Sequence, residues 1–449
     1  MEAQDFMQIV FVSNYINHHQ IPFCEAMCRE TGNRFAFIQT EPMEEERVRM
    51  GWKKENDKEY VHCYYEEEMF CRKLIQDSDV VLFGGCDDES YIGERLAAGK
   101  PIVRVSERLY KTGQWKAVSP RGLLKKYHDH TRYRNAPVYL LCAGAYVPSD
   151  FHIVRAYPGK MFCWGYFPRT VHYDVDNLLE HKGFPVGDDI IVKNAVEEAE
   201  QGIVENAENE SGGKLGDQTE GKAEGTEATE VKKVPYLLWA ARFIDWKHPE
   251  LPLRTAAYLR DKGLAFHMDI VGGGAMEEEV SALFKELKLE NVVTLVGYQT
   301  PDEVRSRMEK ADIVLQTSDR QEGWGAVANE AMNSGCALVT NHMIGASPYL
   351  VKQGENGFLY RDGDETMLFE TVEKLVRNPE LCRQTGRCAY QTVTEVWNAE
   401  NAAKRLMDLI DTVVLKNKRV QPARDMRNLF PCAPAPVISE RKMWKELTR

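Results

Sequence analysis

The sequence predicts an α/β protein with two parallel-sheet domains joined by a flexible segment. Three observations predict this class. The chain has 449 residues, which is too long for one ordinary domain. Apolar runs typical of buried strands alternate with helical patterns, and this alternation occurs twice. Between the two series lies a stretch that is acidic and almost free of large apolar residues.

The first half alternates in the order expected of a sheet covered by helices on both faces. Continuous apolar runs predict strands, and spaced apolar residues predict helices. In chain order we expect a strand at 7–13, a helix from Phe23, a strand ending in the glycines at 84–85, a helix over Tyr91–Gly99, a strand after Pro101, helices around Leu123–Tyr127 and Tyr139–Tyr146, and a short strand at Met161–Trp164.

The segment between the two series carries eleven acidic and two basic residues from Asn194 to Glu230. It cannot bury enough apolar surface to offset the entropy of ordering, so we expect a flexible insertion. The predicted boundaries are an N-terminal domain at 1–185, the insertion at 186–233 and a C-terminal domain at 234–399. Residues 400–449 are expected to pack back on the first domain.

The second half repeats the alternation more clearly and predicts about six strands. The expected elements are a strand from Pro235, a helix at 249–263, a strand over FHMDIVGGG, a helix at 276–288, a strand over NVVTLVGY, a helix at 301–310, and strands over ADIVLQTS, CALVTN and GFLY, with a short helix near Pro348–Lys352 before the last. Ligands of open parallel sheets bind at the carboxyl ends of the strands. The loops after these strands are therefore the ones to inspect.

Four of those loops carry complementary chemistry. Arg242 and Lys247 follow the first strand and suit phosphate oxygens. A glycine triplet containing Gly273 and Gly274 follows the second, and GYQTPDE follows the third. After the fourth strand, RQEGWGAVANEAMNSG places Glu322 in a turn and Glu330 on the helix that follows. The start of a helix offers free backbone N–H groups to an anion, whereas carboxylates suit hydroxyl groups. The combination indicates a ligand with phosphates in the middle and sugars at both ends.

These stretches resemble family 4 of the retaining glycosyltransferases. EGWGAVANEAMNSGCALVT is similar to the E-x7-E signature of that family, and ARFIDWK to its Arg-x4-Lys pattern. IVGGG, VTLVGYQ and VKQGENGFLY resemble further motifs in the same order, over about 235–360. The resemblance implies the GT-B fold, in which two Rossmann-like domains face a cleft and C-terminal helices cross back to the first domain.

The family also implies roles for individual residues. Glu322, Arg242 and Lys247 would be catalytic: Glu322 would hold the transferred sugar, and the two cations would neutralise the leaving diphosphate. The donor would also contact Glu330, through its ribose, and a set of loop residues: Gly273, Gly274, Tyr298, Gly323, Trp324, Gly325, Ala326 and Val327. No metal and no cofactor is expected. Two positions depart from the family pattern, since His248 replaces its usual glycine and Tyr349 its usual acidic residue.

The acceptor side is less defined by the sequence. The loop after the first strand reads NYINHHQ, and we expect Asn14, His18 and His19 to enter the cleft. A histidine there would bind a sugar hydroxyl or help to deprotonate the acceptor; core or capping roles are the alternative. Residues 104–135 contain nine Lys or Arg against two acidic residues, with aromatic and leucine side chains between them. This segment predicts contact with an anionic membrane surface or a lipid-linked acceptor, with a solvated face as the alternative.

Taken together, the sequence predicts transfer of a hexose-type sugar from a nucleotide sugar, with UDP-sugars favoured, to a glycan or lipid-linked glycan. The setting would be cell-surface polysaccharide biosynthesis. The alternatives are a catalytically silent GT-B binding subunit and a nucleotide-sugar epimerase; a dehydrogenase is disfavoured because G-x-G-x-x-G is incomplete. No nucleic-acid motif, signal-like start or membrane-spanning run is seen, and the eleven cysteines are scattered. We therefore expect a cytoplasmic protein, partly at the inner face of the membrane, that binds no nucleic acid.

Overall fold

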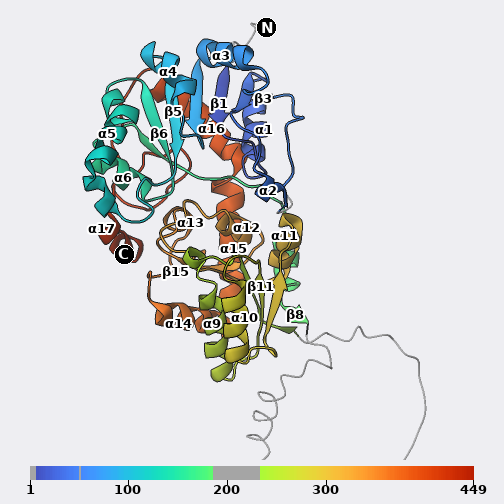
Figure 1. Ribbon diagram of the computed structural model, residues 1–449. Helices are drawn as coiled ribbons and strands as arrows, with labels where there is room; N and C mark the ends of the chain where they lie inside the picture. The colour runs from blue at the N-terminus through green and yellow to red at the C-terminus, as the bar shows by residue number, and fades with distance from the viewer. Residues whose placement is uncertain (1–6, 50–51, 186–232) are drawn as a thin grey trace, which may run out of the picture.

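The computed structural model describes residues 7–49, 52–185 and 233–449. It has two parallel sheets, one above the other along the long axis of the molecule (Figure 1). The predicted insertion lies outside the described residues, except Lys233. Among the helices that are described, none is long and apolar enough to cross a bilayer. The exact domain boundaries stay a prediction, whereas the predicted GT-B arrangement of two Rossmann-like domains is confirmed.

The first sheet has seven parallel strands in the order β3-β2-β1-β4-β5-β6-β7. Its strands are β1 (Ile9–Ser13), β2 (Phe35–Gln39), β3 (Val61–Cys63), β4 (Val80–Gly84), β5 (Ile102–Ser106), β6 (Val138–Ala143) and β7 (Met161–Trp164). The helices that follow them are α1 (Ile21–Glu30), α2 (Glu45–Arg49), α3 (Glu68–Asp77), α4 (Ser90–Ala97), α5 (Pro120–Asp129), α6 (Val147–Ile153) and α7 (Val175–Glu180). All five residues of β1 are buried, as a central parallel strand requires.

Two expectations for this sheet need correction. The stretch Tyr139–Tyr146 was expected to be helical, but its first five residues, Tyr139–Ala143, lie in β6 and its last three form the turn before α6. All six residues of β6 are buried, between β5 and β7. A short apolar run of this kind fits a buried strand as well as a buried helix, and only its neighbours decide. The edge strand β3 and its neighbour β2 were not predicted at all.

The second sheet has six parallel strands in the order β12-β11-β10-β13-β14-β15. They are β10 (Tyr236–Ala240), β11 (His267–Val271), β12 (Val293–Gly297), β13 (Ile313–Gln316), β14 (Ala337–Asn341) and β15 (Phe358–Tyr360). Its helices are α9 (Glu250–Asp261), α10 (Glu277–Glu286), α11 (Pro301–Lys310), α12 (Val327–Asn333), α13 (Ser347–Leu350), α14 (Glu365–Val376) and α15 (Pro379–Gln391). The strands predicted for this half are confirmed. A short antiparallel pair, β8 (Phe184–Pro185) and β9 (Lys233–Val234), borders the insertion.

The chain returns to the first domain through α16 (Ala399–Leu409), which lies alongside α1 (Figure 1). Arg29 on α1 forms an ion pair with Glu400 on α16. Further on, the Cys432 backbone N–H donates to the Cys163 carbonyl at 2.8 Å, next to β7. The last helix, α17 (Glu440–Leu447), follows this segment. These contacts confirm the predicted crossing of the C-terminal helices.

Candidate active site between the two domains

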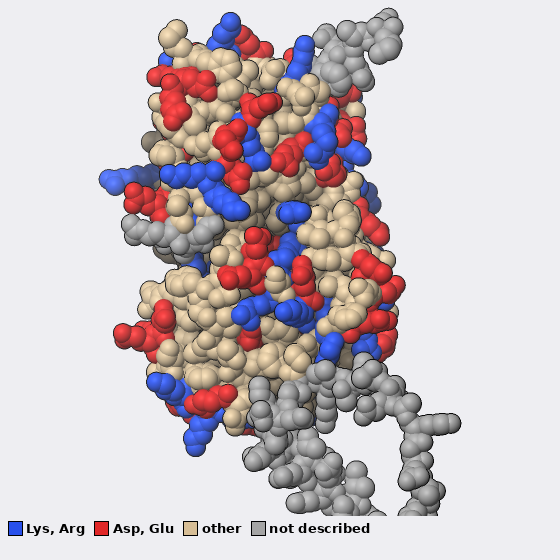
Figure 2. Space-filling view, turned by 90° about the vertical axis from the view of Figure 1, so that its right-hand side faces the viewer, with Lys and Arg blue, Asp and Glu red and all other residues tan. Residues whose placement is uncertain are grey.

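A cleft of about 1260 Å³ separates the two sheets. Its walls are the loops after β1, β4 and β5 on one side and after β10, β11, β12 and β13 on the other. The hollow is visible at mid-height of the molecule, with side chains of both charges at its rim (Figure 2). Pockets for one small ligand measure about 300–1,000 Å³, so this cleft has room for more than one.

Lys247 and Arg242 reach the cleft from the loop after β10. The Lys247 ammonium forms a direct ion pair with the Glu322 carboxylate, and each side chain is 13% exposed. Arg242 makes no side-chain hydrogen bond or ion pair with any described residue. This loop therefore presents the unpaired guanidinium of Arg242, together with a lysine whose carboxylate partner was predicted to hold sugar.

The backbone conformation at His248 explains why the family usually has glycine at this position. Its backbone is left-handed, with φ 52° and ψ 59°, a conformation that costs a residue with a β-carbon about 1 kcal/mol. The imidazole is held by Glu250, at 2.9 Å, and faces Asp319 at 3.8 Å. The carboxylates of Asp319 and Glu250 raise the pKa of His248 to about 10. The cationic ring thus offsets the backbone cost and fixes the loop that carries Lys247.

The Glu322–Glu330 segment forms the floor of the cleft on the second domain. Gly325 has φ 87°, which lets the chain turn sharply into α12 and brings Ala326 and Val327 to the cleft. The Glu330 carboxylate accepts no hydrogen bond from any described residue, and burial raises its pKa against the opposing charge of Arg305. A carboxylate in this position can accept hydrogen bonds from the hydroxyl groups of a ligand.

The other predicted donor-side residues divide into two groups. Tyr298, Trp324, Gly325, Ala326, Val327 and Glu330 line the cleft, as do Arg242, Lys247 and Glu322. Gly273, Gly274 and Gly323 lie just behind the surface of the cleft. Of the glycine triplet, only Gly272 lines the cleft itself. A β-carbon at Gly274 would lie 2.8 Å from the carbonyl oxygen of Phe243. The triplet is needed for the close approach of two loops, and its contact with a donor stays a prediction.

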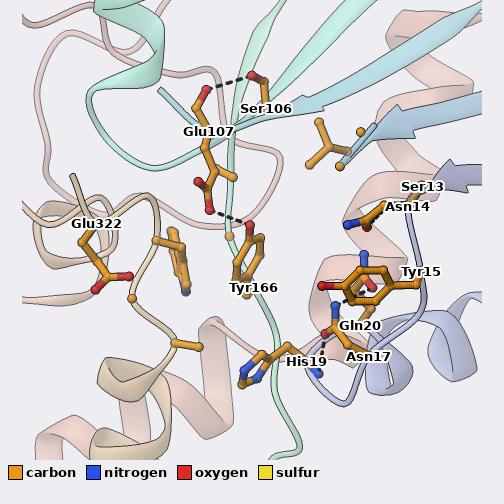
Figure 3. A pocket seen from close by; sticks show the side chains of 18 of the residues that line it. Ser13, Asn14, Tyr15, Asn17, His19, Gln20, Ser106, Glu107, Tyr166 and Glu322 are labelled. Atoms are coloured by element: carbon orange, nitrogen blue, oxygen red, sulfur yellow. Dashed lines mark hydrogen bonds between the residues drawn. The ribbon is translucent and has the colours of Figure 1, made fainter. Parts of the chain in front are cut away.

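On the first domain, Asn14, His18 and His19 enter the cleft as expected (Figure 3 shows Asn14 and His19). The centroids of the two imidazole rings are 3.9 Å apart. The His18 ring packs edge-on against Trp52, with 4.6 Å between the ring centroids. Burial, with the positive neighbours His18 and Arg47, lowers the pKa of His19 to about 3. A histidine with so low a pKa is a weak base at neutral pH, which favours hydroxyl binding over proton abstraction.

Sequence reasoning missed Glu107, the residue that follows β5 directly. It lines the cleft and accepts hydrogen bonds from Tyr166, at 2.6 Å, and from Lys111, at 2.6 Å (Figure 3). A signal existed, because Glu107 is a charged residue at the carboxyl end of a parallel strand. It was counted as part of the basic segment instead.

The basic segment 104–135 is only partly a surface feature. Arg104 is buried and makes a two-pronged pair with Glu89, and Arg108 is buried near Asp150 and Glu440. The remaining part, around η1 (Gln114–Val118) and α5, exposes large apolar side chains: Trp115, Val118, Leu123, Leu124 and Tyr127. The number of outward-facing charges is thus smaller than the sequence suggests.

Comparison with known proteins assigns the second domain. Residues 223–392 match the family described as glycosyl transferases group 1. The match covers most of the C-terminal domain, which is thus similar to the group 1 glycosyl transferases. It is similar to the putative colanic acid biosynthesis glycosyltransferase WcaL of Salmonella typhimurium, with 25% identity over 39% of this chain and 45% of the relative. It is 28% identical to the putative glycosyltransferase EpsD of Bacillus subtilis over 31% of this chain and 36% of that protein. The matched regions span less than half of these relatives.

Solved structures show the fold of the whole chain. The Anabaena protein HepE, in complex with UDP, superposes with a TM-score of 0.59 at 13% identity and covers 91% of this chain and 100% of its own. A glycosyltransferase from Rickettsia africae gives a TM-score of 0.57 at 13% identity, covering 92% of this chain and 100% of its own. The likeness confirms the predicted GT-B fold, and the group 1 match lies mainly in its second domain.

Proposed function

We propose that this protein is a retaining glycosyltransferase that moves a hexose-type sugar from a nucleotide sugar to a glycan or lipid-linked glycan. The observation that carries the proposal is the second domain's wall of the cleft. It combines an unpaired Arg242, the Lys247–Glu322 pair and the unpartnered carboxylate of Glu330. The cations suit a diphosphate and the two carboxylates suit two sugars, which is the composition of a nucleotide sugar.

A UDP-sugar is the favoured donor, and cell-surface polysaccharide the favoured product. The Anabaena protein has been solved with UDP and with UDP-glucose. Relatives are named for colanic acid and amylovoran biosynthesis. The donor would lie with its ribose at Glu330 and its hexose at Glu322. Tyr298 would line the base, and Gly323 to Val327, with the loop of Gly273 and Gly274, would surround the phosphates.

The chemistry that we propose keeps the configuration of the anomeric carbon. The bond from that carbon to the diphosphate breaks, the acceptor oxygen bonds on the same face, and its proton passes to a departing phosphate oxygen. Arg242 and Lys247 stabilise the charge that develops on the diphosphate, which is the largest contribution that such a site supplies. No residue of this scheme requires a metal or a cofactor.

The test is a donor panel measured on the full chain. UDP-, GDP- and ADP-sugars are titrated by calorimetry, and donor hydrolysis is followed for each. Wild type should bind one nucleotide class, and Glu330→Ala should weaken that binding at least about tenfold, the loss of one or two hydrogen bonds to a charged group. Glu286→Ala, an exposed carboxylate on α10, is the matched control. Binding without any turnover, across donors and acceptors, would favour the silent-subunit alternative instead.

We also propose that η1 and α5 rest on the inner face of a membrane, which would bring a lipid-linked acceptor to the cleft. The exposed Trp115, Val118 and Leu124 lie beside Lys116 and Arg121, a combination typical of interfacial binding. Sedimentation with anionic vesicles should recover wild type but not Leu124→Asp. Equal recovery with neutral and anionic vesicles, or none with either, would contradict the proposal.

A further inference from the structure

The carboxylate of Glu107 lies where the first domain meets the turn that carries Glu322. It is held from two sides, since Tyr166 donates to Oε1 and Lys111 to Oε2, each at 2.6 Å. Its side chain is 27% exposed, so it is neither a buried structural ion nor a free surface group. Figure 3 shows Glu107 and Tyr166 in the pocket, with Glu322 on the opposite side.

Both oxygens of Glu107 keep the capacity to accept more. An ionised carboxylate offers about four lone-pair sites, and the tyrosine and the lysine use two of them. The pair also fixes the plane of the carboxylate, because a hydroxyl and an ammonium anchor different oxygens. A ligand hydroxyl would therefore meet a preorganised acceptor, without the cost of ordering a flexible side chain.

Gly323 shows how close the two carboxylates come. A β-carbon at Gly323 would overlap the carboxylate of Glu107, so the backbone next to Glu322 is in contact with it. The pKa of Tyr166 is raised well above its usual value, first by burial. The next causes are the charge of Glu107 and the hydrogen bond to it, followed by the charge of Glu322, so both carboxylates act on this hydroxyl. Glu107 and Glu322 thus border one region of the cleft from opposite domains.

We propose that Glu107 is a specificity-determining residue that accepts hydrogen bonds from the hydroxyl groups of the transferred sugar and, with Glu322, excludes donors whose sugar carries an anionic group. The inference rests on the proposed glycosyltransferase function. It assigns the sugar-binding region to both domains, with one carboxylate from each.

The charge of the region explains the exclusion. In the protein alone, Lys247 neutralises Glu322 and Lys111 neutralises Glu107. When a diphosphate enters, Lys247 is drawn to it, and Glu322 loses part of its counter-charge. A hexuronic acid would then place a third carboxylate beside two others in a partly desolvated region, where like charges are strongly unfavourable. A neutral hexose or an amino sugar meets no such penalty.

The experiment compares wild type and Glu107→Gln with matched donors. The probes are the nucleoside-diphosphate hexose that wild type selects in the panel above, its hexuronic acid counterpart and the nucleoside diphosphate without sugar. Glutamine keeps the shape and removes the charge. We expect turnover of the hexose donor to fall about 10- to 100-fold, and the preference for hexose over hexuronic acid to fall at least about tenfold. The Kd of the sugar-free nucleoside diphosphate should stay within about twofold.

Two further variants separate this role from a merely structural one. Tyr166→Phe removes the hydroxyl that positions Glu107, and should lower hexose turnover in the same direction by a smaller factor. Glu94→Gln, a carboxylate exposed on α4, should change nothing. Unchanged hexose preference in Glu107→Gln, or equal loss of sugar-free nucleotide binding, would overturn this inference while leaving the proposed function intact. Failure of wild type to turn over any nucleotide sugar would overturn both.

Discussion

The ion pair between Lys247 and Glu322 leads to a prediction with an unexpected sign: Glu322→Gln should bind a nucleoside diphosphate more tightly than wild type. In the protein alone the lysine is bonded to a carboxylate that was predicted to hold sugar. A diphosphate must draw the lysine away from that carboxylate and must also approach its negative charge. Glutamine removes the competition and the repulsion while keeping the size of the side chain.

The magnitude follows from the exposure of the pair. Fully exposed ion pairs contribute about 0.2–1 kcal/mol, and hydrogen bonds to charged groups about 1.5–3 kcal/mol. With each side chain 13% exposed, the pair lies between these cases, at about 1–2 kcal/mol. Releasing it should tighten binding of the sugar-free nucleoside diphosphate roughly 5- to 30-fold, since about 1.4 kcal/mol is a factor of ten.

Calorimetric titration of wild type, Glu322→Gln, Lys247→Met and the double variant measures this directly. Lys247→Met should weaken nucleoside diphosphate binding. Adding Glu322→Gln to Lys247→Met should improve the affinity less than adding it to wild type, because without the lysine it removes only the repulsion between Glu322 and the diphosphate. The difference between the two gains is the coupling energy of the pair. Weaker binding by Glu322→Gln than by wild type would refute the reasoning, because Glu322 would then support the diphosphate rather than compete for its lysine.

Three further predictions concern other parts of the site. Burial raises the pKa of Glu330 above that of an exposed carboxyl group, so lowering the pH should protonate it early and weaken donor binding by wild type; calorimetric titrations at several pH values should show a smaller change for Glu330→Gln. Asp319 and Glu250 raise the pKa of His248 to about 10. The stability that they add is fully present below about pH 6.5 and is lost as pH rises through about 10. The free energy of unfolding of His248→Ala in urea should therefore approach that of wild type only at high pH. Trp324→Ala should lose about 3–5 kcal/mol of unfolding free energy in urea, because its ring is completely buried.

Much of the second domain could be predicted because its strands are long apolar runs with glycine-rich or acidic loops after them. The candidate donor loops follow from one rule, that ligands bind at the carboxyl ends of parallel strands. Asn14, His18 and His19 were proposed from the loop after the first strand, and they do line the cleft. The error at Tyr139–Tyr146 has a physical origin, since a fully buried strand shows no alternation that would distinguish it from a helix.

What could not be predicted depends on contacts between residues far apart in the sequence. The pairing of Lys247 with Glu322, and the low pKa of His19, follow from packing and not from any local pattern. The left-handed backbone of His248 was visible only as a departure from the family. The sequence could show that Glu107 follows a parallel strand, but not that it lies beside Gly323, because that position depends on how the two domains face one another.

The turn that is proposed to hold the donor also forms contacts between the two domains. A β-carbon at Gly345 would overlap the carbonyl of Gly323, and one at Gly144 would lie 3.0 Å from that oxygen, while the Ala145 N–H donates across the interface to the Gly345 carbonyl at 3.0 Å. Backbone thus meets backbone directly behind Glu322. Any movement of one domain relative to the other must shift the turn that carries this carboxylate, so under the proposed function donor affinity would depend on the relative position of the two domains.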